Sequence, residues 1–359
     1  MMKPLPWLLP LAIPYQAAVQ TRNRLYDLGA LTVREVPVPV VSVGNISVGG
    51  TGKSPFVIHL ASHIRELTAG RLKLAVVTRG YGGSYTGTLA VSDGRKVLGT
   101  PEAAGDEAVM LAEAVSGLVV IVDRNRLRGA QAAVSEYRAR LLILDDGFQH
   151  RRLKRDLDIV LLDARNPLGN RLMLPAGYLR EPVKSLARAH LVVLSKALGT
   201  AEELEERRRR LEALINKPVV VTRLEPRFWK RVSGGEILAA DQVSGKRVLA
   251  FAGIAQPGGF FETVHNLGGV LCDRIPLPDH CRFTKSQLDM IAGRFVRSKA
   301  EWLVTTGKDA VKLPAILRFL PVYQLDISLQ IAAGKEHLEL ALAGILKLAV
   351  EARDNPKSR

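Results

Sequence analysis

The stretch Val41–Pro55, VSVGNISVGGTGKSP, decides the fold, because it joins a β-branched run to a glycine-rich loop that ends in lysine and serine. A largely apolar, helix-compatible segment, Phe56–Ile64, follows it. Strand, glycine loop, Lys-Ser and helix is the order of a phosphate-binding loop. Glycines let backbone N–H groups crowd around phosphate oxygens, and the helix N-terminus adds partial positive charge. We therefore predict Lys53 beside the β- and γ-phosphates of a nucleotide and Ser54 on Mg²⁺.

This loop departs from the strict pattern GxxxxGK[ST] at one position, where Ser47 replaces a glycine. Gly44, Gly49 and Gly50 keep the loop rich in glycine. A plain glycine turn between a strand and a helix is the alternative. Such a turn has no need of a Lys-Ser pair at its exit, so the phosphate-binding interpretation is favoured.

Length and charge limit the classes of protein to consider. The 359 residues are enough for two domains, and 47% hydrophobic residues support sizeable cores. An excess of 51 Lys+Arg over 35 Asp+Glu favours an anionic partner, such as nucleic acid, acidic lipid or a phosphorylated substrate. Nucleic acid is disfavoured because aromatics are only 5% and do not interleave with a basic run. Cys272 and Cys281 form no metal or disulfide pattern, which fits a reducing cytoplasm.

The N-terminal segment is apolar and uncharged over residues 4–20. It is slightly short for a membrane span, contains four prolines, and has no clear signal-peptide cleavage site. Three interpretations remain: a helix in the membrane interface with Trp7 and Tyr15 at headgroup level, an arm that packs on the protein's own core, and a true span. The interfacial helix is favoured.

Apolar strands alternate with helical segments along the rest of the chain, which predicts an α/β fold with a mostly parallel sheet flanked by helices. A composition shift at 227–236 precedes a second strand–turn–helix unit near Arg247. Three parts are therefore predicted: the apolar segment 1–30, a kinase-like domain 31–225, and a smaller α/β domain 226–359. The predicted strands are 72–77, 118–122, 140–144, 158–163, 190–195, 218–224 and 302–306.

Charged residues follow several of these strands. Asp145 and Asp146 come directly after an apolar strand, which is typical of a phosphoryl-transfer site where one carboxylate holds Mg²⁺. A polar Asp-Asp-Gly turn is the alternative. Arg79 follows another strand beside glycines, where it either meets a phosphate or is a surface arginine in a turn. Asp106 and Glu107 lie at a helix start, and N-capping is the simpler interpretation from pattern alone.

Seven stretches together resemble the tetraacyldisaccharide 4′-kinase family, the lipid A 4′-kinases of Gram-negative bacteria. The resemblance covers nearly the whole chain. The stretches are VGNISVGGTGKSP (43–55), VTRGYGG (77–83), GDEA (105–108), LDDGFQHRRLKRDLDIVLLD (144–163), LPAGYLREP (174–182), PDHCRFT (278–284) and TTGKDAVKL (305–313).

The resemblance implies a P-loop kinase-like fold that uses ATP and Mg²⁺ at the cytoplasmic face of the inner membrane. The implied reaction transfers the γ-phosphate to the 4′-hydroxyl of an acylated glucosamine disaccharide 1-phosphate lipid. It implies no nucleic-acid partner, and no obligate protein partner is evident. The favoured alternative is a P-loop ATPase or GTPase switch at the membrane surface. A GTPase would need a guanine-binding motif, Asn-Lys-x-Asp. The most similar stretch, Lys308-Asp309, lacks the asparagine.

The resemblance also implies roles for individual residues. Asp106 matches the general base of the family, and His280 matches the residue that pairs with it, which replaces the N-capping interpretation of Asp106. Cys281 departs from the many relatives that carry a second histidine there. The implied catalytic set is completed by Lys53, Asp145 and Asp146, and the metal ligands are Ser54 with either or both acids. The implied nucleotide-binding residues are Ser47, Val48, Gly49, Gly50, Thr51, Gly52, Lys53 and Ser54. The implied substrate-binding residues are Arg79, Gln149, His150, Arg171, Arg180 and Glu181, with Arg124 a further candidate for a phosphate contact.

Overall fold

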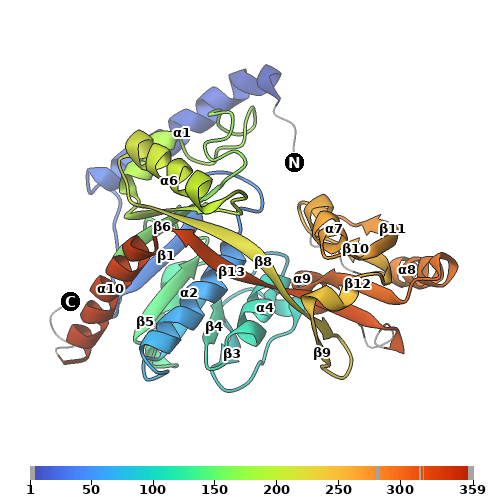
Figure 1. Cartoon of the computed structure of the whole chain (residues 1–359). Helices are drawn as coiled ribbons and strands as arrows, with labels where there is room; N and C mark the ends of the chain where they lie inside the picture. Colours follow the sequence, from blue (N-terminus) through green and yellow to red (C-terminus); the bar gives the residue numbers. More distant parts are fainter. Residues whose placement is uncertain (1–4, 280, 282, 315–316, 318, 355–359) are drawn as a thin grey trace.

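The computed structural model describes residues 5–279, 281, 283–314, 317 and 319–354. In this part of the chain, thirteen strands form one sheet in the order β11-β10-β12-β13-β8-β7-β6-β1-β5-β2-β4-β3, with β9 on β8 (Figure 1). The strands are β1 Val40–Asn45, β2 Leu74–Thr78, β3 Leu89–Asp93, β4 Val119–Val122, β5 Leu141–Asp145, β6 Leu157–Asp163, β7 Leu191–Ser195, β8 Val219–Arg231, β9 Ile237–Ala239, β10 Arg247–Ala252, β11 Val270–Pro276, β12 Trp302–Thr306 and β13 Val322–Ala333.

Helices cover both faces of this sheet, as the alternating pattern predicts. The α-helices are α1 Leu9–Asp27, α2 Lys53–Leu67, α3 Pro101–Ala104, α4 Asp106–Ala114, α5 Arg126–Ser135, α6 Ala201–Ile215, α7 Pro257–Asn266, α8 Lys285–Ser298, α9 Gly307–Ala310 and α10 Lys335–Asp354. Short 3₁₀ turns are η1 Pro6–Leu8, η2 Val183–Arg188 and η3 Ala240–Val243.

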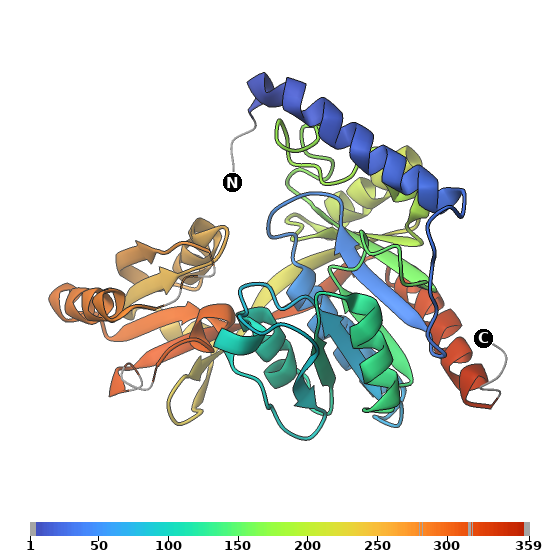
Figure 2. The same cartoon turned by 180° about the vertical axis from the view of Figure 1, so that it is seen from behind.

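The molecule has two lobes joined by two long strands (Figures 1 and 2). We call the part built on β1–β7 the main lobe and the part built on β10–β12 the small lobe. The joining strands, β8 and β13, pair antiparallel, whereas the β1, β2 and β4–β8 pairings within the main lobe are parallel. The predicted boundary between residues 225 and 226 falls within β8 and stays a prediction.

The strands of the main lobe are continuous apolar runs, because both faces of the sheet are covered. Every residue of β1, β2, β5 and β6 is buried. This is the pattern of parallel strands between two helical layers. Strand β1 lies between β5 and β6, and Val43 pairs in register with Asp145. Since parallel strands end at the same edge of a sheet, the loop after β1 and the acid pair after β5 are brought together.

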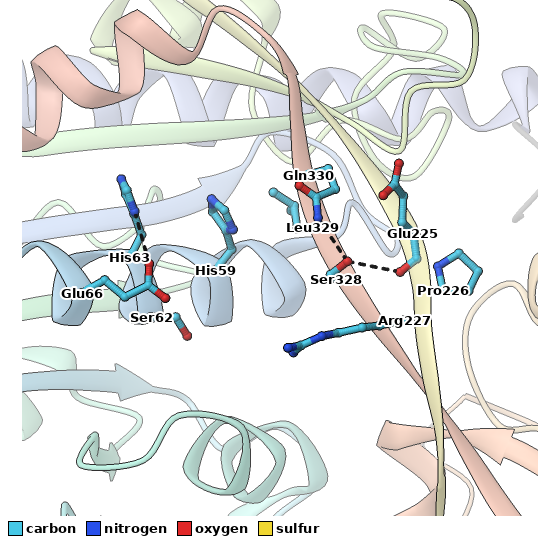
Figure 3. A pocket seen from close by; sticks show the side chains of 10 residues that line it. All are labelled: His59, Ser62, His63, Glu66, Glu225, Pro226, Arg227, Ser328, Leu329 and Gln330. Atoms are coloured by element: carbon cyan, nitrogen blue, oxygen red, sulfur yellow. Dashed lines mark hydrogen bonds and ion pairs between the residues drawn. The ribbon is translucent and has the colours of Figure 1, made fainter. Parts of the chain in front are cut away.

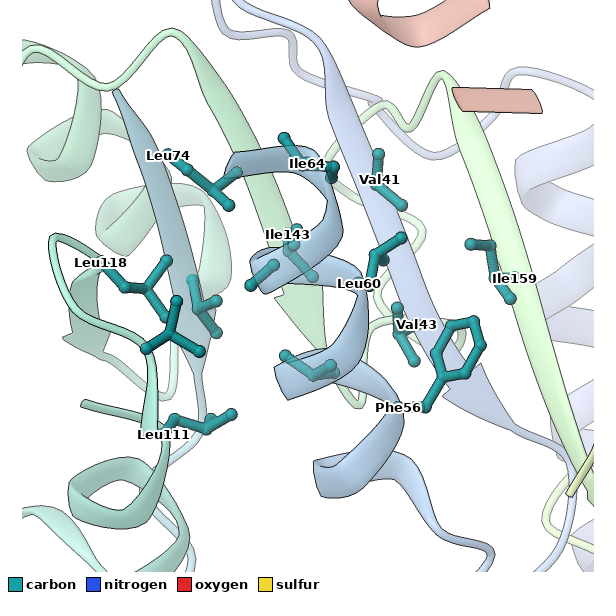
Figure 4. Packing of buried hydrophobic residues seen from close by; sticks show 14 of the residues in the cluster. Val41, Val43, Phe56, Leu60, Ile64, Leu74, Leu111, Leu118, Ile143 and Ile159 are labelled. Carbon is teal, nitrogen blue, oxygen red and sulfur yellow. The ribbon is translucent and has the colours of Figure 1, made fainter. Parts of the chain in front are cut away.

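Helix α2 packs through one apolar face. Phe56, Leu60 and Ile64 are spaced four residues apart and are fully buried against β1 residues Val41 and Val43 (Figure 4). Helix α10, from the far end of the chain, adds buried leucines and an isoleucine to the same cluster. This packing fixes the direction of α2, so its N-terminus lies at the edge where the strands end.

The small lobe is a sheet between two helices. Alternate residues of β10 face opposite sides: Val248 and Ala250 belong to the cluster of α7, whereas Leu249 and Phe251 belong to the cluster of α8. Thr284 caps α8 in a reciprocal capping box with Gln287. The second strand–turn–helix unit predicted near Arg247 consists of β10 and α7 in this lobe.

Helix α1 lies along the outside of the main lobe (Figure 2). Its N-terminal end and the preceding turn η1 expose apolar side chains, among them Ile13 of α1, which is 62% exposed, and Trp7 of η1, which is 72% exposed. No helix among residues 5–354, where they are described, is long and apolar enough to cross a membrane.

The other end of α1 is fixed by a buried carboxylate. Glu181 is fully buried and accepts hydrogen bonds from Asn23 of α1 and from Arg188, both at 2.9 Å. Arg22 of α1 lies 3.8 Å from the same carboxylate. Burial alone would raise the pKa of Glu181, but the charge and hydrogen bond of Arg188 hold it below its usual value. Glu181 therefore ties α1 to the main lobe.

We predict that Gly44→Ala destabilises the main lobe. A Cβ at Gly44 would lie 2.6 Å from the Cβ of Phe148 and 2.8 Å from its backbone nitrogen, so β1 and the turn after β5 would have to separate. Overpacking of this kind costs about 1–3 kcal/mol of unfolding free energy. Urea unfolding of the variant and the wild type measures this loss in the free energy of unfolding. The matched control is Gly258→Ala, a helical position with nothing within 4 Å of the added Cβ, which should be neutral or stabilising. Equal stability of the two variants would contradict the prediction.

We also predict that Glu181→Gln loosens α1. The substitution leaves the Arg188 charge buried without its partner, which costs about 3–5 kcal/mol of unfolding free energy. Because the pKa of Glu181 is lowered in the fold, its contribution is full above the usual glutamate pKa and is lost as pH falls through the lowered value. Urea unfolding at neutral and acidic pH measures both effects. Glu35→Gln removes an exposed pair with Lys154 and should cost less than about 1 kcal/mol; a similar loss in both variants would argue against the buried tie.

Candidate functional site

The loop between β1 and α2 is held by side chains from the end of β7. Gly49 and Gly52 have φ of 108° and 78°, which favour glycine. Ser195 Oγ donates to the Thr51 carbonyl at 2.7 Å, and Lys196 Nζ donates to the Gly50 carbonyl. The loop backbone is therefore preorganised. Val48 differs from the expectation that every loop N–H is open to a phosphate, because its N–H donates to the Tyr178 carbonyl at 2.7 Å.

Lys53, the first residue of α2, faces the acid pair. Its Nζ lies 3.4 Å from Asp146 Oδ1. Arg180 makes a bidentate contact with the same carboxylate, at 2.8 and 3.0 Å, and a further hydrogen bond to Asn45 Oδ1. Burial would raise the pKa of Asp146, but the Arg180 hydrogen bonds and the Lys53 charge hold it far below its usual range. Asp146 is thus ionised and bound to two cations.

The surroundings of Asp145 raise its pKa, whereas those of Asp146 lower it. It is 3% exposed, and Thr78 donates to its Oδ2 at 2.8 Å. Its Oδ1 is buried without a hydrogen-bond partner in the described part of the chain. Burial, and then the negative charges of Glu107 and Asp146, raise the pKa of Asp145. A buried carboxylate with an open oxygen beside other acids is a site where a cation is favourable.

Beneath this pair lies Arg126, which is only 2% exposed. Its guanidinium donates to the backbone carbonyls of Asp123 and Asp145, at 3.0 and 3.3 Å, and so joins the ends of β4 and β5. Burial lowers the pKa of Arg126 to about 10, well above neutrality, so it remains charged. In sequence it is one of five arginines at 124–140 and has no distinguishing signal.

Helix α4 begins beside the acid pair. Asp106 is its first residue and is 5% exposed. The N-cap position belongs to Gly105, and Asp106 accepts a hydrogen bond from the Glu107 N–H at 3.0 Å, so the side-chain N-capping interpretation of Asp106 is wrong. The small lobe reaches this helix start: Lys312 lies 3.5 Å from Asp106 and Lys308 lies 3.2 Å from Glu107.

The other predicted site residues divide into two groups. Gln149 donates to the Asn45 carbonyl at 2.9 Å, and His150 lies among Arg126, Asp146 and Arg79. Burial and the Arg126 charge lower the pKa of His150 to about 4, so its imidazole is neutral at physiological pH. These residues lie with Lys53, Asp145, Asp146 and Arg180.

A second group lies outside this cluster or exposes its side chains. Glu181 is turned toward α1, away from the loop. Arg171 is exposed in the loop that ends at Glu181, and its φ is 58°. Arg79 and Arg124 are exposed at the ends of β2 and β4. His280 lies outside the described residues. Sequence reasoning did not find Asn45, Thr78, Arg126 or Lys196, each of which has a partner more than 15 residues away in the chain.

A cavity of about 530 Å³ lies elsewhere, between α2 and the β8–β13 ribbon (Figure 3). His59 and His63 line it from α2, and Glu225, Arg227 and Gln330 line it from the two strands. None of its lining residues belongs to the predicted site. No group of three or more His, Cys, Asp or Glu side chains in the described part of the chain is arranged to hold a metal ion without other ligands.

Comparisons with known proteins address the family of this chain. The family model for tetraacyldisaccharide-1-P 4′-kinase matches residues 5–347. The tetraacyldisaccharide 4′-kinase of Anaeromyxobacter sp. (strain K) is 38% identical over 350 residues, covering 96% of this chain and 92% of the relative. That of Geobacter metallireducens is 39% identical over 338 residues, covering 94% and 96%.

A solved structure is similar over nearly the whole chain. It is the "apo" form of LpxK from Aquifex aeolicus in complex with ATP, with a TM-score of 0.76 and 33% identity over 94% of this chain and 98% of that chain. The match of sequence motifs, sheet and family model leads to one conclusion: the chain belongs to the tetraacyldisaccharide 4′-kinase family.

Proposed function

We propose that this protein transfers the γ-phosphate of ATP to the 4′-hydroxyl of tetraacyldisaccharide 1-phosphate. The observation that carries the proposal is the meeting, at one edge of the sheet, of the glycine loop, the acid pair and the start of α4. Family membership across residues 5–347 supports the same activity. The lipid acceptor is the substrate that gives the relatives their name.

The loop 47–54 binds the phosphates of ATP through backbone N–H groups other than that of Val48, which already donates to the Tyr178 carbonyl. Support comes from its shape, from the ATP complex of the Aquifex relative, and from Lys53 at the N-terminus of α2. In the structure, Lys53 is paired with Asp146. On binding, its ammonium turns to the β- and γ-phosphates, and Arg180 keeps Asp146 ionised.

The residues at the acid pair fit Mg²⁺. The open, buried Oδ1 of Asp145 is a suitable ligand, and Ser54, in the first turn of α2, offers a hydroxyl. Mg²⁺ is held in kinases by one or two carboxylates together with substrate phosphates, so a cage of three protein acids is not required. Of the two acids Asp145 is the better ligand, because Asp146 already binds Lys53 and Arg180. When bound, Mg²⁺ neutralises negative charge on the phosphate oxygens.

Asp106 acts as the general base. Its carboxylate accepts the proton of the 4′-hydroxyl as that oxygen forms a bond to the γ-phosphorus. The bond from phosphorus to the bridging oxygen of ATP breaks, and ADP leaves with the electron pair. Lys53 and the loop amides stabilise the charge on the transferred group. The influence of Glu107 on the pKa of Asp145 supports this assignment, because it means that the start of α4 lies near the acid pair.

The acceptor is a lipid, and α1 offers a surface for a membrane. Trp7, Leu11 and Ile13 expose 72%, 59% and 62% of their surface on its N-terminal end. A net charge of +16 favours the anionic leaflet and the 1-phosphate of the substrate. We place the enzyme at the cytoplasmic face of the inner membrane, where ATP is present, with α1 in the interface.

Replacement of the proposed base tests the reaction. Asp106→Asn should lower kcat for transfer of radiolabelled γ-phosphate to the lipid acceptor by about 10²–10⁴-fold, because proton removal is lost. The affinity for ATP, measured by calorimetry, should stay within about twofold, since the loop is untouched. Glu113→Gln, exposed at the other end of α4, is the matched control. Full activity of Asp106→Asn would remove the base assignment, and a wild-type protein that hydrolyses ATP without phosphorylating the lipid would favour the nucleotide switch.

Replacement of Asp145 and replacement of Asp146 should have different effects on the Mg²⁺ requirement of the enzyme. Asp145→Asn should raise the Mg²⁺ concentration needed for half-maximal activity by about tenfold or more, because it removes a charged ligand oxygen. Asp146→Asn should instead raise KM for ATP, since Lys53 and Arg180 lose the carboxylate that positions them. Titration of activity with Mg²⁺ at saturating ATP separates the two effects. The reverse result, with the Mg²⁺ requirement moved only by Asp146→Asn, would exchange the two roles.

A further inference from the structure

The stretch TTGKDAVKL at 305–313 has no role in the chemistry described above, although it is one of the stretches that carries the family resemblance. It forms the end of β12, the short helix α9 and the turn after it. Asp309 is fully buried there and accepts hydrogen bonds from Thr306 Oγ1 and from the Gly253 N–H, both at 2.9 Å. This acid therefore fixes the segment within the small lobe.

Lys312 is held by that acid and points out of the small lobe. Its Nζ lies 3.1 Å from Asp309 Oδ1 and 5.7 Å from the centre of the Phe283 ring. It also lies 3.5 Å from Asp106 Oδ2, in the main lobe. The Lys312 side chain is only 9% exposed, and a charge this buried is costly unless it is paired. Asp309 supplies one partner inside the lobe, and Asp106 supplies the second across the interface.

A second lysine makes the neighbouring contact. Lys308 lies 3.2 Å from Glu107 and 3.2 Å from Asp279. Burial alone would lower the pKa of Lys308, but the charges of Glu107, Asp106 and Asp279 raise it, so the ammonium is retained. Two cations of the small lobe thus face two acids at the start of α4. A carboxylate next to a fixed ammonium is held in its ionised form, which is the form that accepts a proton.

We propose that Lys312 is a positioning residue for the general base, because it holds the Asp106 carboxylate ionised and oriented from the opposite lobe. Lys308 strengthens the contact between the small lobe and the start of α4 through its ion pair with Glu107. Asp106 can therefore accept a proton efficiently only while the small lobe contacts the start of α4. The activity of the base thus depends on the position of the small lobe. This inference rests on the proposed function, since it takes Asp106 as the base.

The test is kinetic. Lys312→Met keeps the length of the side chain and removes the charge. It should lower kcat for lipid phosphorylation by between about 10- and 100-fold, since a misplacement of about an ångström has effects of that size. KM for ATP should stay within about twofold of wild type, because the loop is not altered. Lys312→Arg, which restores a cation, should recover much of kcat. Lys347→Met, at an exposed lysine of α10, is the matched control and should retain wild-type kcat.

A double variant separates positioning from general damage. If Lys312 acts through the Asp106 carboxylate, Lys312→Met should cause no further loss of the residual rate in an Asp106→Asn background. The inference is overturned if the double variant loses kcat by the product of the two single losses. It is also overturned if Lys312→Met alone leaves kcat unchanged. If thermal unfolding shows that Lys312→Met does not fold, Lys312→Gln takes its place with the same expected kcat loss and the same overturning results. A wild-type enzyme without lipid phosphorylation would instead overturn the proposed function.

Discussion

The parallel pairing of β1 with β5 is the constraint on which the site depends. The register Val43 with Asp145 makes both strands end at one edge, where the glycine loop follows one strand and the acid pair follows the other. The strands approach so closely here that Gly44 lies against the backbone of Phe148. Asp146, with φ of 53°, turns the chain so that successive carboxylates point to different neighbours. One register thus brings Lys53 to Asp146 and leaves Asp145 on the other side of the turn.

The two carboxylates consequently have opposite electrostatic roles. Asp146 binds Arg180 and Lys53 and is fully ionised. Arg126 lies close to Asp145 but donates to its backbone carbonyl, not to its carboxylate, so the turn is supported while the acid keeps an open oxygen. A buried polar group of this kind is a local cost to the fold. Such violations concentrate at functional sites, where the missing partner is a ligand, and a divalent cation would satisfy Asp145 in this way.

The sequence predicted those features that depend on neighbours in the chain. The glycine loop and the apolar strands that precede Arg79 and Asp145 follow from local pattern and lie where expected. Contacts between residues distant in the chain could not be predicted from local sequence pattern. Arg126 is one arginine among several, and only the fold brings it beneath Asp145. Likewise, nothing near Glu181 in sequence indicates that its partners are Asn23 and Arg22, some 158 residues earlier.

The arrangement of the two lobes follows from two connections of different kinds. The first is the β8–β13 ribbon, which continues the sheet from one lobe into the other. A cavity of about 530 Å³ lies between this ribbon and α2, so the ribbon is not packed there at the density of a protein core. The second connection is the charged contact of Lys308 and Lys312 with the start of α4. The ribbon joins the lobes through backbone hydrogen bonds, whereas the charged contact joins them through long lysine side chains. That contact includes Asp106, so the same ion pairs that seat the small lobe also set the state of the proposed base.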